Sequence, residues 1–404
     1  MFLITFVSLL VLGSILFWIV YHMPILIAGF RGRDGDPESE ADCFPKVSVI
    51  VPAKDEEGVI ERCLRSLLNV DYPRDRIEII VVDGSSDSTT DICRRFQMEN
   101  PGLVKVVRED NPHGKPSALN LGLKHATGEV IAVFDADSVV EKDSFIKAVG
   151  HLQGGAVAVQ GKTKCLNKSR SILARLVHFE QEAWQQLMLN GRERLGLFVP
   201  FTGSCLFIKR KLLEELGGWS ESCLAEDVEL SARLLLEKGV KVKFAPDVVS
   251  WQEAPGKLKT LIGQRSRWYR GYMEVSVRYL RLLRRTCLAS LDAEILLFGP
   301  FYMAASIIGY LCWLLNMLYP ASNIFLTVLA VLAGGLTCTS IVLALLYLER
   351  PLNPGKLALA PFVYAYWIIQ SLIALKSALD LVSGRPKAWR KTEKEGFSDL
   401  QAAN

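Results

Sequence analysis

Asp135 and Asp137 directly follow a short apolar run, Val130–Phe134, and their type and spacing suit them to bind a cation. A continuous run of β-branched and apolar residues predicts a strand buried on both faces of a parallel sheet. Because side chains alternate along a strand, both carboxylates project to the same side at its carboxyl end, where open α/β sheets bind ligands. Two adjacent carboxylates repel unless a cation lies between them, which favours Mg²⁺ or Mn²⁺. The alternative is a solvated turn after the strand.

Two more polar residues lie at the ends of predicted elements. Asp83 ends the apolar run 77–82, where its carboxylate could accept a hydrogen bond from a uracil N–H or a ribose hydroxyl. The alternative for Asp83 is an Asx-turn that caps the next helix. Lys115 follows Gly114 and could neutralise a diphosphate, or could be an ordinary solvated charge.

An acidic pair, Glu226 and Asp227, stands at the start of an amphipathic helix expected to end near Gly239. An acidic pair at the start of a helix interacts favourably with the helix macrodipole, which is the structural alternative to a functional role. Upstream, residues 201–204 precede a strand expected over 205–208.

A polar and aromatic face is predicted on a later helix. If residues 258–272 are helical, Gln264, Arg267 and Trp268 lie at spacings of three and four and share one face. An arginine there could bind a diphosphate, and the indole could stack on a sugar ring. The alternative is a basic amphipathic surface helix.

Strands and helices alternate in the region that must position these residues. Strands are expected over 47–51, 77–82, 104–107 and 130–134, and helices over 56–68, from about residue 90, and over 115–125. This alternation predicts an α/β fold with a doubly wound, mostly parallel sheet. The chain has no GxGxxG and no GxxxxGK[ST] sequence, so neither a dinucleotide site nor a P-loop is expected.

Composition narrows the class of protein. The 404 residues carry a net charge of +4, which does not call for nucleic acid as a partner. Nine cysteines occur without any CxxC pair, which fits a reduced compartment better than a disulfide framework.

The two ends of the chain are apolar and predict membrane segments. Residues 1–30 exceed the roughly 20 residues that span a bilayer, and basic residues follow them, which places the next part in the cytoplasm. We expect a linker over 31–45, a catalytic domain over 46–257, and basic amphipathic helices at the membrane surface over 258–290. A transmembrane region over 291–382 and a basic cytoplasmic tail over 383–404 follow.

The topology of the C-terminal part contains a conflict. Three further apolar segments lie near 295–319, 323–348 and 357–381. If these three and the N-terminal segment 1–30 all crossed the membrane, the C-terminus would lie outside, whereas the basic residues of the tail favour the cytoplasm. We therefore expect an internal tail, with the segment 357–381 interfacial or re-entrant. The segment 171–189 is interpreted either as a helix that touches the interface or as a core helix.

Residues 46–275 resemble the family 2 glycosyltransferases, the group that includes cellulose, hyaluronan and chitin-oligosaccharide synthases and ceramide glucosyltransferase. The discriminating piece is the Q-x-x-R-W motif, which soluble non-processive members generally lack. Asp55 departs from the family, which more often has Asn at this position. The matching pieces are 49–56, 83–87, Gly114-Lys115, 118–120, 135–137, Thr202-Gly203, Glu226-Asp227 and 264–268.

The resemblance implies a GT-A type α/β domain that binds a nucleotide-sugar, with UDP as the expected nucleotide. Asp83 and Asp135 would hold the uridine, and Asp137, with Asp135, the Mg²⁺ or Mn²⁺ ion. Asp227 would be the general base, with Glu226 as the other member of the catalytic pair. The remaining implied positions are Pro52, Ala53, Asp55, Glu56 and Lys115 for the donor, Gln264, Arg267 and Trp268 over diphosphate and acceptor, and Thr202, Gly203 and Ser204 for the acceptor.

Three functions follow from this resemblance. The first is an inverting synthase that extends a β-linked polysaccharide, and the second is transfer of a single sugar to a membrane lipid. The third is a non-catalytic membrane partner that binds the nucleotide-sugar without turnover. The expected setting is the plasma membrane with the catalytic domain in the cytoplasm, in contact with membrane lipids and with a homo-oligomer as a further possibility. Residues 389–392 resemble a C-terminal motif that covers the bound nucleotide in related synthases.

Overall fold

An eight-stranded sheet forms the centre of the protein in this computed structural model, which describes residues 2–31, 43–285, 287–318, 358–387, 394 and 396. The strand order is β3-β2-β1-β4-β7-β6-β8-β5. The strands are β1 (Val47–Ala53), β2 (Ile77–Asp83), β3 (Val104–Arg108), β4 (Val130–Val133), β5 (Val139–Val140), β6 (Ala158–Cys165), β7 (Leu206–Lys209) and β8 (Lys243–Gln252).

The sheet is mixed, and its N-terminal half is parallel as predicted. β1 pairs in parallel with β2 and β4, and β2 pairs in parallel with β3. β7 is antiparallel to both β4 and β6, and β5 is antiparallel to β8, whereas β6 and β8 are parallel. The carboxyl ends of β1, β2 and β4 therefore meet at one edge, which is where the predicted donor residues lie.

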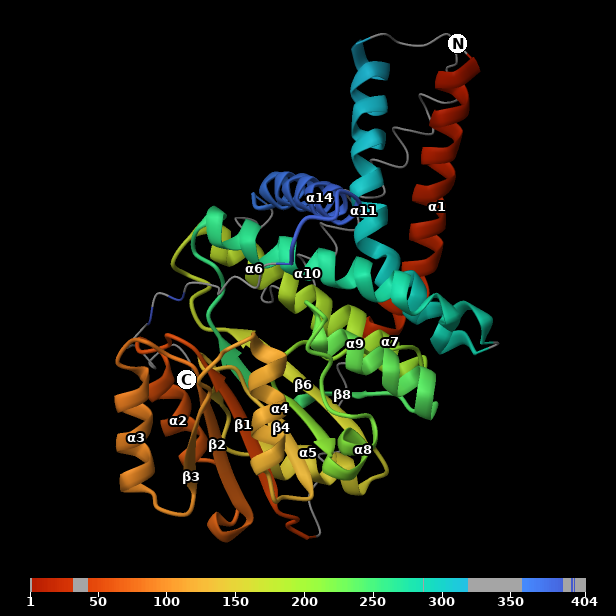
Figure 1. Ribbon diagram of the computed structural model, residues 1–404. Helices are drawn as coiled ribbons and strands as arrows, with labels where there is room; N and C mark the ends of the chain where they lie inside the picture. Colours follow the sequence, from red (N-terminus) through yellow and green to blue (C-terminus); the bar gives the residue numbers. More distant parts are fainter. Residues whose placement is uncertain are drawn as a thin grey trace.

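Helices cover both faces of the sheet (Figure 1). α2 (Ile60–Leu68), α3 (Thr89–Glu99) and α5 (Ser144–Gln153) lie over one face, and α4 (Lys115–His125) and α8 (Arg210–Glu215) over the other. Val49 and Val51 belong to the first apolar core, whereas Ile50 between them belongs to the second. Burial on both faces explains why β1, β2 and β4 read as continuous apolar runs.

A second group of helices packs beside the sheet. α6 (Ile172–Glu182) continues through a π-helical turn, Ala183–Leu189, into α7 (Asn190–Arg194). Its buried residues pack against Leu261, Val363 and Tyr366, so the segment 171–189 is a core helix for most of its length. The other helices of this group are α9 (Glu226–Arg233), α10 (Leu258–Arg278), α11 (Leu288–Leu318), α14 (Ala360–Val382) and the N-terminal α1 (Phe2–Arg31).

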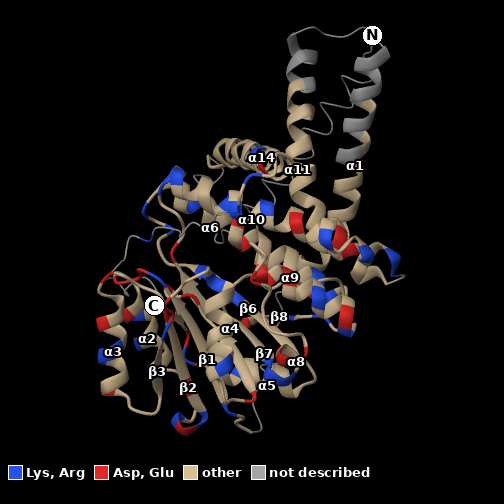
Figure 2. Ribbon diagram, in the orientation of Figure 1, with Lys and Arg blue, Asp and Glu red and all other residues tan. Residues whose placement is uncertain are grey.

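α1 and α11 extend away from the α/β domain, and α14 lies crosswise beside α11 and α10 (Figure 1). Two helices in the described ranges, Leu288–Leu311 and Ala360–Val382, are long and apolar enough to cross a membrane. Lys, Arg, Asp and Glu are concentrated on the α/β domain and at the adjoining ends of these helices (Figure 2). The apolar segment predicted over 323–348 lies outside the described residues.

α14 has its polar side turned inward. Gln370, Ser371 and Ser377 are buried against the protein, whereas Leu372 and Leu379 are more than half exposed. A helix in water shows the opposite arrangement. This polarity agrees with a helix that lies between the α/β domain and an apolar surrounding.

One buried ionic group fastens α1 and α11 to the domain. Arg192 of α7 donates to Asp292 of α11 at 2.6 Å and to the hydroxyl of Tyr21 in α1 at 2.9 Å. Tyr21 donates in turn to Asp292 at 2.6 Å. A buried charge is tolerated when it is paired and hydrogen-bonded, so this group fixes how the two long helices leave the domain.

Candidate active site

Asp135 lies in a network of three polar partners beyond the end of β4. Its carboxylate accepts hydrogen bonds from Lys115 Nζ at 2.5 Å and from Gln252 Nε2 at 3.1 Å. Its backbone N–H donates to Ser204 Oγ at 3.1 Å. Burial acts against ionisation, but the Lys115 ammonium outweighs it and holds the pKa of Asp135 below its ordinary value.

Lys115 links Asp135 to the acidic pair of α9. Its ammonium also donates to the carbonyl of Gly203 at 2.7 Å and lies 3.9 Å from Glu226 Oε1. Gly203 has φ of +85°, and a Cβ there would lie 3.3 Å from Asp227 Oδ2. The structure thus brings together residues that are far apart in the sequence, around the partly buried Lys115.

Asp227 is buried in an acidic environment that favours its protonated form. Burial and the adjacent Glu226 carboxylate raise its pKa to about 7, although Lys115 and Arg267 act in the opposite direction. A carboxyl group with this pKa can exchange a proton near neutral pH, as a general base must.

α10 places the predicted polar face next to the acidic pair. The helix runs over Leu258–Arg278, longer than the expected 258–272. A Cβ on Gly271 would lie 2.6 Å from the Cβ of Ala225, so α10 packs closely on the residue before the pair. Within the described residues, Gln264 Oε1 and Arg267 Nε are buried without a hydrogen-bond partner. Trp268 is 37% exposed.

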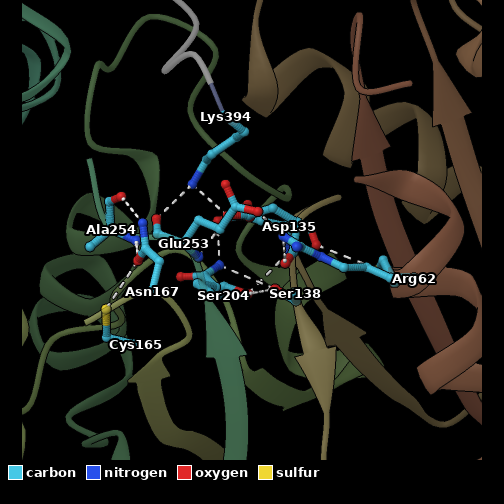
Figure 3. Close-up of polar contacts among 12 residues, drawn as sticks. Arg62, Asp135, Ser138, Cys165, Asn167, Ser204, Glu253, Ala254 and Lys394 are labelled. Atoms are coloured by element: carbon cyan, nitrogen blue, oxygen red, sulfur yellow. Dashed lines mark hydrogen bonds and ion pairs between the residues drawn. The ribbon is translucent and has the colours of Figure 1, made fainter. Parts of the chain in front are cut away.

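Asp137 lies beside Asp135 and is 3% exposed. Lys394 of the tail forms an ion pair with its carboxylate and donates to the carbonyl of Glu253 at 3.2 Å (Figure 3). Arg62 donates to the Asp137 carbonyl at 3.4 Å and forms an ion pair with Glu253 at 2.7 Å. The tail therefore reaches the site from the C-terminus, although residues 389–392 themselves lie outside the described part.

The two carboxylates suit a divalent cation. An ammonium group contacts each carboxylate, Lys115 at Asp135 and Lys394 at Asp137. The two carboxylates therefore form a site that favours positive charge. Both offer the oxygen atoms that Mg²⁺ and Mn²⁺ prefer. In the described ranges, no three His, Cys, Asp or Glu side chains gather as a ready-made metal site.

Asp83 ends β2, which is separated from β4 by β1 along the same edge of the sheet. Its carboxylate accepts from Thr90 Oγ1 at 2.6 Å and from Arg108 at 2.8 Å. It also accepts from the N–H of Ser85 at 3.0 Å, which is the Asx-turn considered from the sequence. These partners come from the loop after β2, from α3 and from β3, so Asp83 has different partners from the residues around Lys115.

The loop after β1 is tied to the loop after β2. Ala53 pairs with Asp83 in the sheet register, and Pro52 precedes it in β1. Asp55 accepts from the N–H of Ser86 at 2.7 Å, and Glu56 donates its N–H to Thr89 Oγ1 at 2.8 Å. α2 begins at Ile60, not at residue 56 as predicted, and a turn over 56–59 leads into it, with the N–H groups of Val59 and Ile60 donating to the Glu56 carbonyl at 3.0 and 2.9 Å.

Asp55 adopts a backbone conformation that explains the family's preference for Asn. Its φ is +55°, in the left-handed region that asparagine tolerates better than most residues. Asp55 in place of the family's Asn is therefore compatible with this backbone conformation, and it adds a negative charge to the loop.

Gln160 supports the loop of Thr202, Gly203 and Ser204, and no sequence motif indicated it. It accepts from the N–H of Thr202 at 2.9 Å and donates to the carbonyl of Ser204 at 2.9 Å. It is fully buried in β6. Gln252 and Arg62 were missed for the same reason, since each reaches the site from a distant segment that has no signature of its own. Lys394 was also missed, although it closely follows residues 389–392, which resemble a nucleotide-covering motif.

The fold and this cluster define a GT-A type glycosyltransferase, and comparisons with known proteins identify the family. The model of the glycosyltransferase-like family 2 matches residues 45–271. The chain belongs to the family 2 glycosyltransferases and is a hexosyltransferase. It is 31% identical to the Bacillus subtilis protein YdaM, named as a probable glycosyltransferase, over 90% of this chain and 84% of YdaM.

Relatives with named products fall into two classes. The chain is 32% identical to the β-monoglucosyldiacylglycerol synthase of Trichormus variabilis, over 70% of this chain and 60% of the synthase. It is 28% identical to the poly-β-1,6-N-acetyl-D-glucosamine synthase of Staphylococcus epidermidis, over 66% of this chain and 63% of that enzyme. The family thus includes both glycolipid and polysaccharide synthases.

A solved structure shows the same fold. The mannosyltransferase PcManGT from Pyrobaculum calidifontis, in complex with GDP-Man and Mn²⁺, has a TM-score of 0.64 and 24% identity. The match covers 93% of this chain and all of PcManGT (100%). The likeness extends through the helices beside the sheet.

Proposed function

We propose that the protein is an inverting, metal-dependent transferase that moves a hexosyl or N-acetylhexosaminyl unit from a nucleotide-sugar to an acceptor at the membrane. The observation that carries the proposal is the meeting of Asp135, Lys115, Gly203 and Asp227 in one partly buried cluster. A cation-binding carboxylate, a positive charge for a diphosphate and a proton acceptor are the parts that such a transfer requires.

The chemical step uses Asp227 as the general base. The acceptor hydroxyl gives its proton to Asp227 as its oxygen bonds to the anomeric carbon, and the bond from that carbon to the diphosphate breaks on the opposite side. A single displacement inverts the anomeric configuration. Lys115 and Arg267 are the cations whose charge reaches Asp227, and they would also stabilise the departing diphosphate.

Asp135 and Asp137 would hold a Mg²⁺ or Mn²⁺ ion. When bound, the ion offsets the negative charge that develops on the leaving diphosphate. Lys394 would have to leave Asp137 before a cation binds there. The resemblance favours UDP as the nucleotide, whereas PcManGT is a complex with GDP-Man, so both donor types belong in the assay.

A membrane lipid is the acceptor that the geometry supports best. Ile172, Leu258 and Phe362 lie near the starts of three packed helices, and each is at least 47% exposed. This apolar rim, together with the outward face of α14, suits an acceptor that approaches from the bilayer. Diacylglycerol is a suitable probe, because the Trichormus relative is named for it.

Extension of a β-linked polysaccharide is the second candidate. The Q-x-x-R-W residues Gln264, Arg267 and Trp268 line the side of α10 that faces the acidic pair, and the Staphylococcus relative is a polymer synthase. Trp268 is exposed enough to stack on a sugar of either acceptor.

A product assay separates these functions. Membranes containing the protein are incubated with Mn²⁺ and radiolabelled UDP-glucose, UDP-N-acetylglucosamine or GDP-mannose, with and without diacylglycerol. Label in the organic extract supports the lipid acceptor, and label in high-molecular-weight material supports the polymer. If no sugar is transferred from any donor while Mn²⁺ and diacylglycerol are in excess over the protein, the proposal is contradicted. The remaining function is then that of a non-catalytic partner.

The proposed setting is the plasma membrane, with the α/β domain in the cytoplasm. α1 and α11 would cross the bilayer, and α14 would lie along its inner surface. This arrangement is supported by the exposed apolar face of α14 and by the arginines Arg281, Arg284 and Arg285, which follow α10 and suit anionic headgroups.

A further inference from the structure

Arg265 lies inside the Q-x-x-R-W segment but points away from the acidic pair. It is 6% exposed, and its Nη2 lies 2.5 Å from Glu180 Oε2 in α6. Its Cζ lies 4.2 Å from the centroid of the Trp268 ring. The guanidinium is therefore held between a carboxylate and an indole.

Glu180 is itself held by α14. Tyr366 donates its hydroxyl to Glu180 Oε2 at 2.7 Å, and Gln370 donates to Oε1 at 3.4 Å. Gln370 in turn accepts from the hydroxyl of Tyr269 in α10 at 2.8 Å. The network thus joins α6, α10 and α14, and its position depends on all three helices.

The Arg265 guanidinium lies against the ring of Trp268. Within the described residues, it is the single cation or aromatic ring found against this indole, and more than a third of the Trp268 side chain is exposed. A planar guanidinium lying on an indole restricts the ring in a way that a flexible ammonium does not.

We propose that Arg265 is a positioning residue that fixes the Trp268 ring for the acceptor and links this ring, through Glu180, to the docking of α14. The inference rests on the proposed function of Trp268 at the acceptor side. A buried ion pair that merely joins helices would not need the contact with the indole.

The kinetic test uses Arg265→Lys, which keeps the charge that Glu180 requires and removes the planar group. With UDP-glucose and diacylglycerol in mixed micelles, we expect the acceptor KM to rise about two- to tenfold, the range for loss of one cation–π contact. The donor KM and kcat should stay at wild-type values. Arg278→Lys, an exposed change on the same helix, is the matched control.

A double-mutant cycle decides whether Arg265 acts through the ring. If it does, Arg265→Lys adds nothing to the acceptor KM in a Trp268→Leu background. An unchanged KM in the single variant, or an equal rise in both backgrounds, overturns the inference.

A spectroscopic readout is independent of turnover. In protein labelled with 5-fluorotryptophan, the ¹⁹F signal that disappears in Trp268→Phe should shift in Arg265→Lys and in Tyr366→Phe, but not in Arg278→Lys. Glu180→Gln tests the same link if the lysine variant does not fold. An unshifted signal overturns the inference, whereas a shifted signal without sugar transfer supports the positioning of the ring and contradicts the proposed acceptor function.

Discussion

At the scale of single residues, charge balance around Lys115 determines what each carboxylate can do. Asp135 lies directly on the ammonium and is stabilised as an anion, whereas Asp227 faces Glu226 and binds its proton more tightly. Two aspartates in one cluster thereby acquire different properties. The first suits cation binding, and the second suits proton transfer.

The first prediction concerns Asp227 as the base. Asp227→Asn removes the proton acceptor and keeps the shape of the side chain, so transfer should fall by roughly 10²–10⁴. Binding of the nucleotide with Mn²⁺, measured by isothermal titration calorimetry, should be unchanged. Wild-type turnover in this variant would exclude Asp227 from the role.

The pH dependence of the reaction follows from the same side chain. A base works only when ionised, and burial with Glu226 raises the pKa of Asp227 to about 7. At limiting acceptor concentration, the wild-type rate should therefore rise about tenfold per pH unit below pH 7 and level off above it. A rate that is flat between pH 5.5 and 8 would contradict this prediction.

Stability should show the opposite trend with pH. The Asp227 carboxyl has an ordinary pKa of 3.8, and the raised value in the folded state means that its ionisation costs stability as pH rises from about 4 to 7. Asp227→Asn, which cannot ionise, should therefore have a higher Tm than wild type at pH 8. The difference should shrink towards pH 4, as measured by thermal unfolding in detergent.

Sequence patterns located the residues that occupy motifs and missed those that support them. Asp135, Asp137 and Asp227 stand beside elements whose apolar pattern is unambiguous. Gln160 and Gln252 are single amides, and their contacts join segments 42 and 117 residues apart. Such contacts depend on strand order, which local patterns do not contain.

At the scale of secondary-structure elements, the same contrast separates the two halves of the sheet. β1, β2 and β4 are buried on both faces, so their composition alone identifies them. β6 carries polar residues such as Lys162 and Thr163, whose buried polar groups find partners on α6 and on the π-helical turn that follows it, and β5 is two residues long. These strands are held by tertiary contacts and leave little pattern in the sequence.

The packing of α10 gives a test at this scale. Gly271→Ala would place a methyl group 2.6 Å from the Cβ of Ala225, so we expect α10 to shift from the acidic pair and sugar transfer to fall. Gly263→Ala, on the same helix with nothing within 4 Å, is the control and should gain about 0.5–1 kcal/mol of stability. Ala225→Gly in the Gly271→Ala background should restore part of the activity.

The relative activities and stabilities of these variants distinguish an effect of helix packing from an effect of helix propensity. If propensity dominated, both alanine variants would be stabilised and equally active. If packing dominates, as the approach of Gly271 to Ala225 requires, Gly271→Ala loses activity and Gly263→Ala does not. Adding Ala225→Gly then raises the activity of the Gly271→Ala variant and leaves that of the Gly263→Ala variant unchanged.

At the scale of the whole molecule, helices from both ends of the chain lie beside the α/β domain. α1 and α11 leave the domain in the same direction, and by Ala360 the chain lies again beside α10. Arg270 then donates to the carbonyl of Arg385 at 2.6 Å, and Lys387 pairs with Glu274 at 2.7 Å. Arg385 and Lys387 thus lie against α10, and Lys394 contacts Asp137.

The last prediction is that the tail lies on the cytoplasmic side with the α/β domain. In intact cells, a cysteine introduced as Ser383→Cys, at an exposed position after α14, should not react with a membrane-impermeant maleimide above the level of the parent protein. It should react once the membrane is permeabilised. Because Lys394 contacts Asp137, strong labelling from outside would require the catalytic carboxylates to be outside as well, where a cytoplasmic nucleotide-sugar does not reach them.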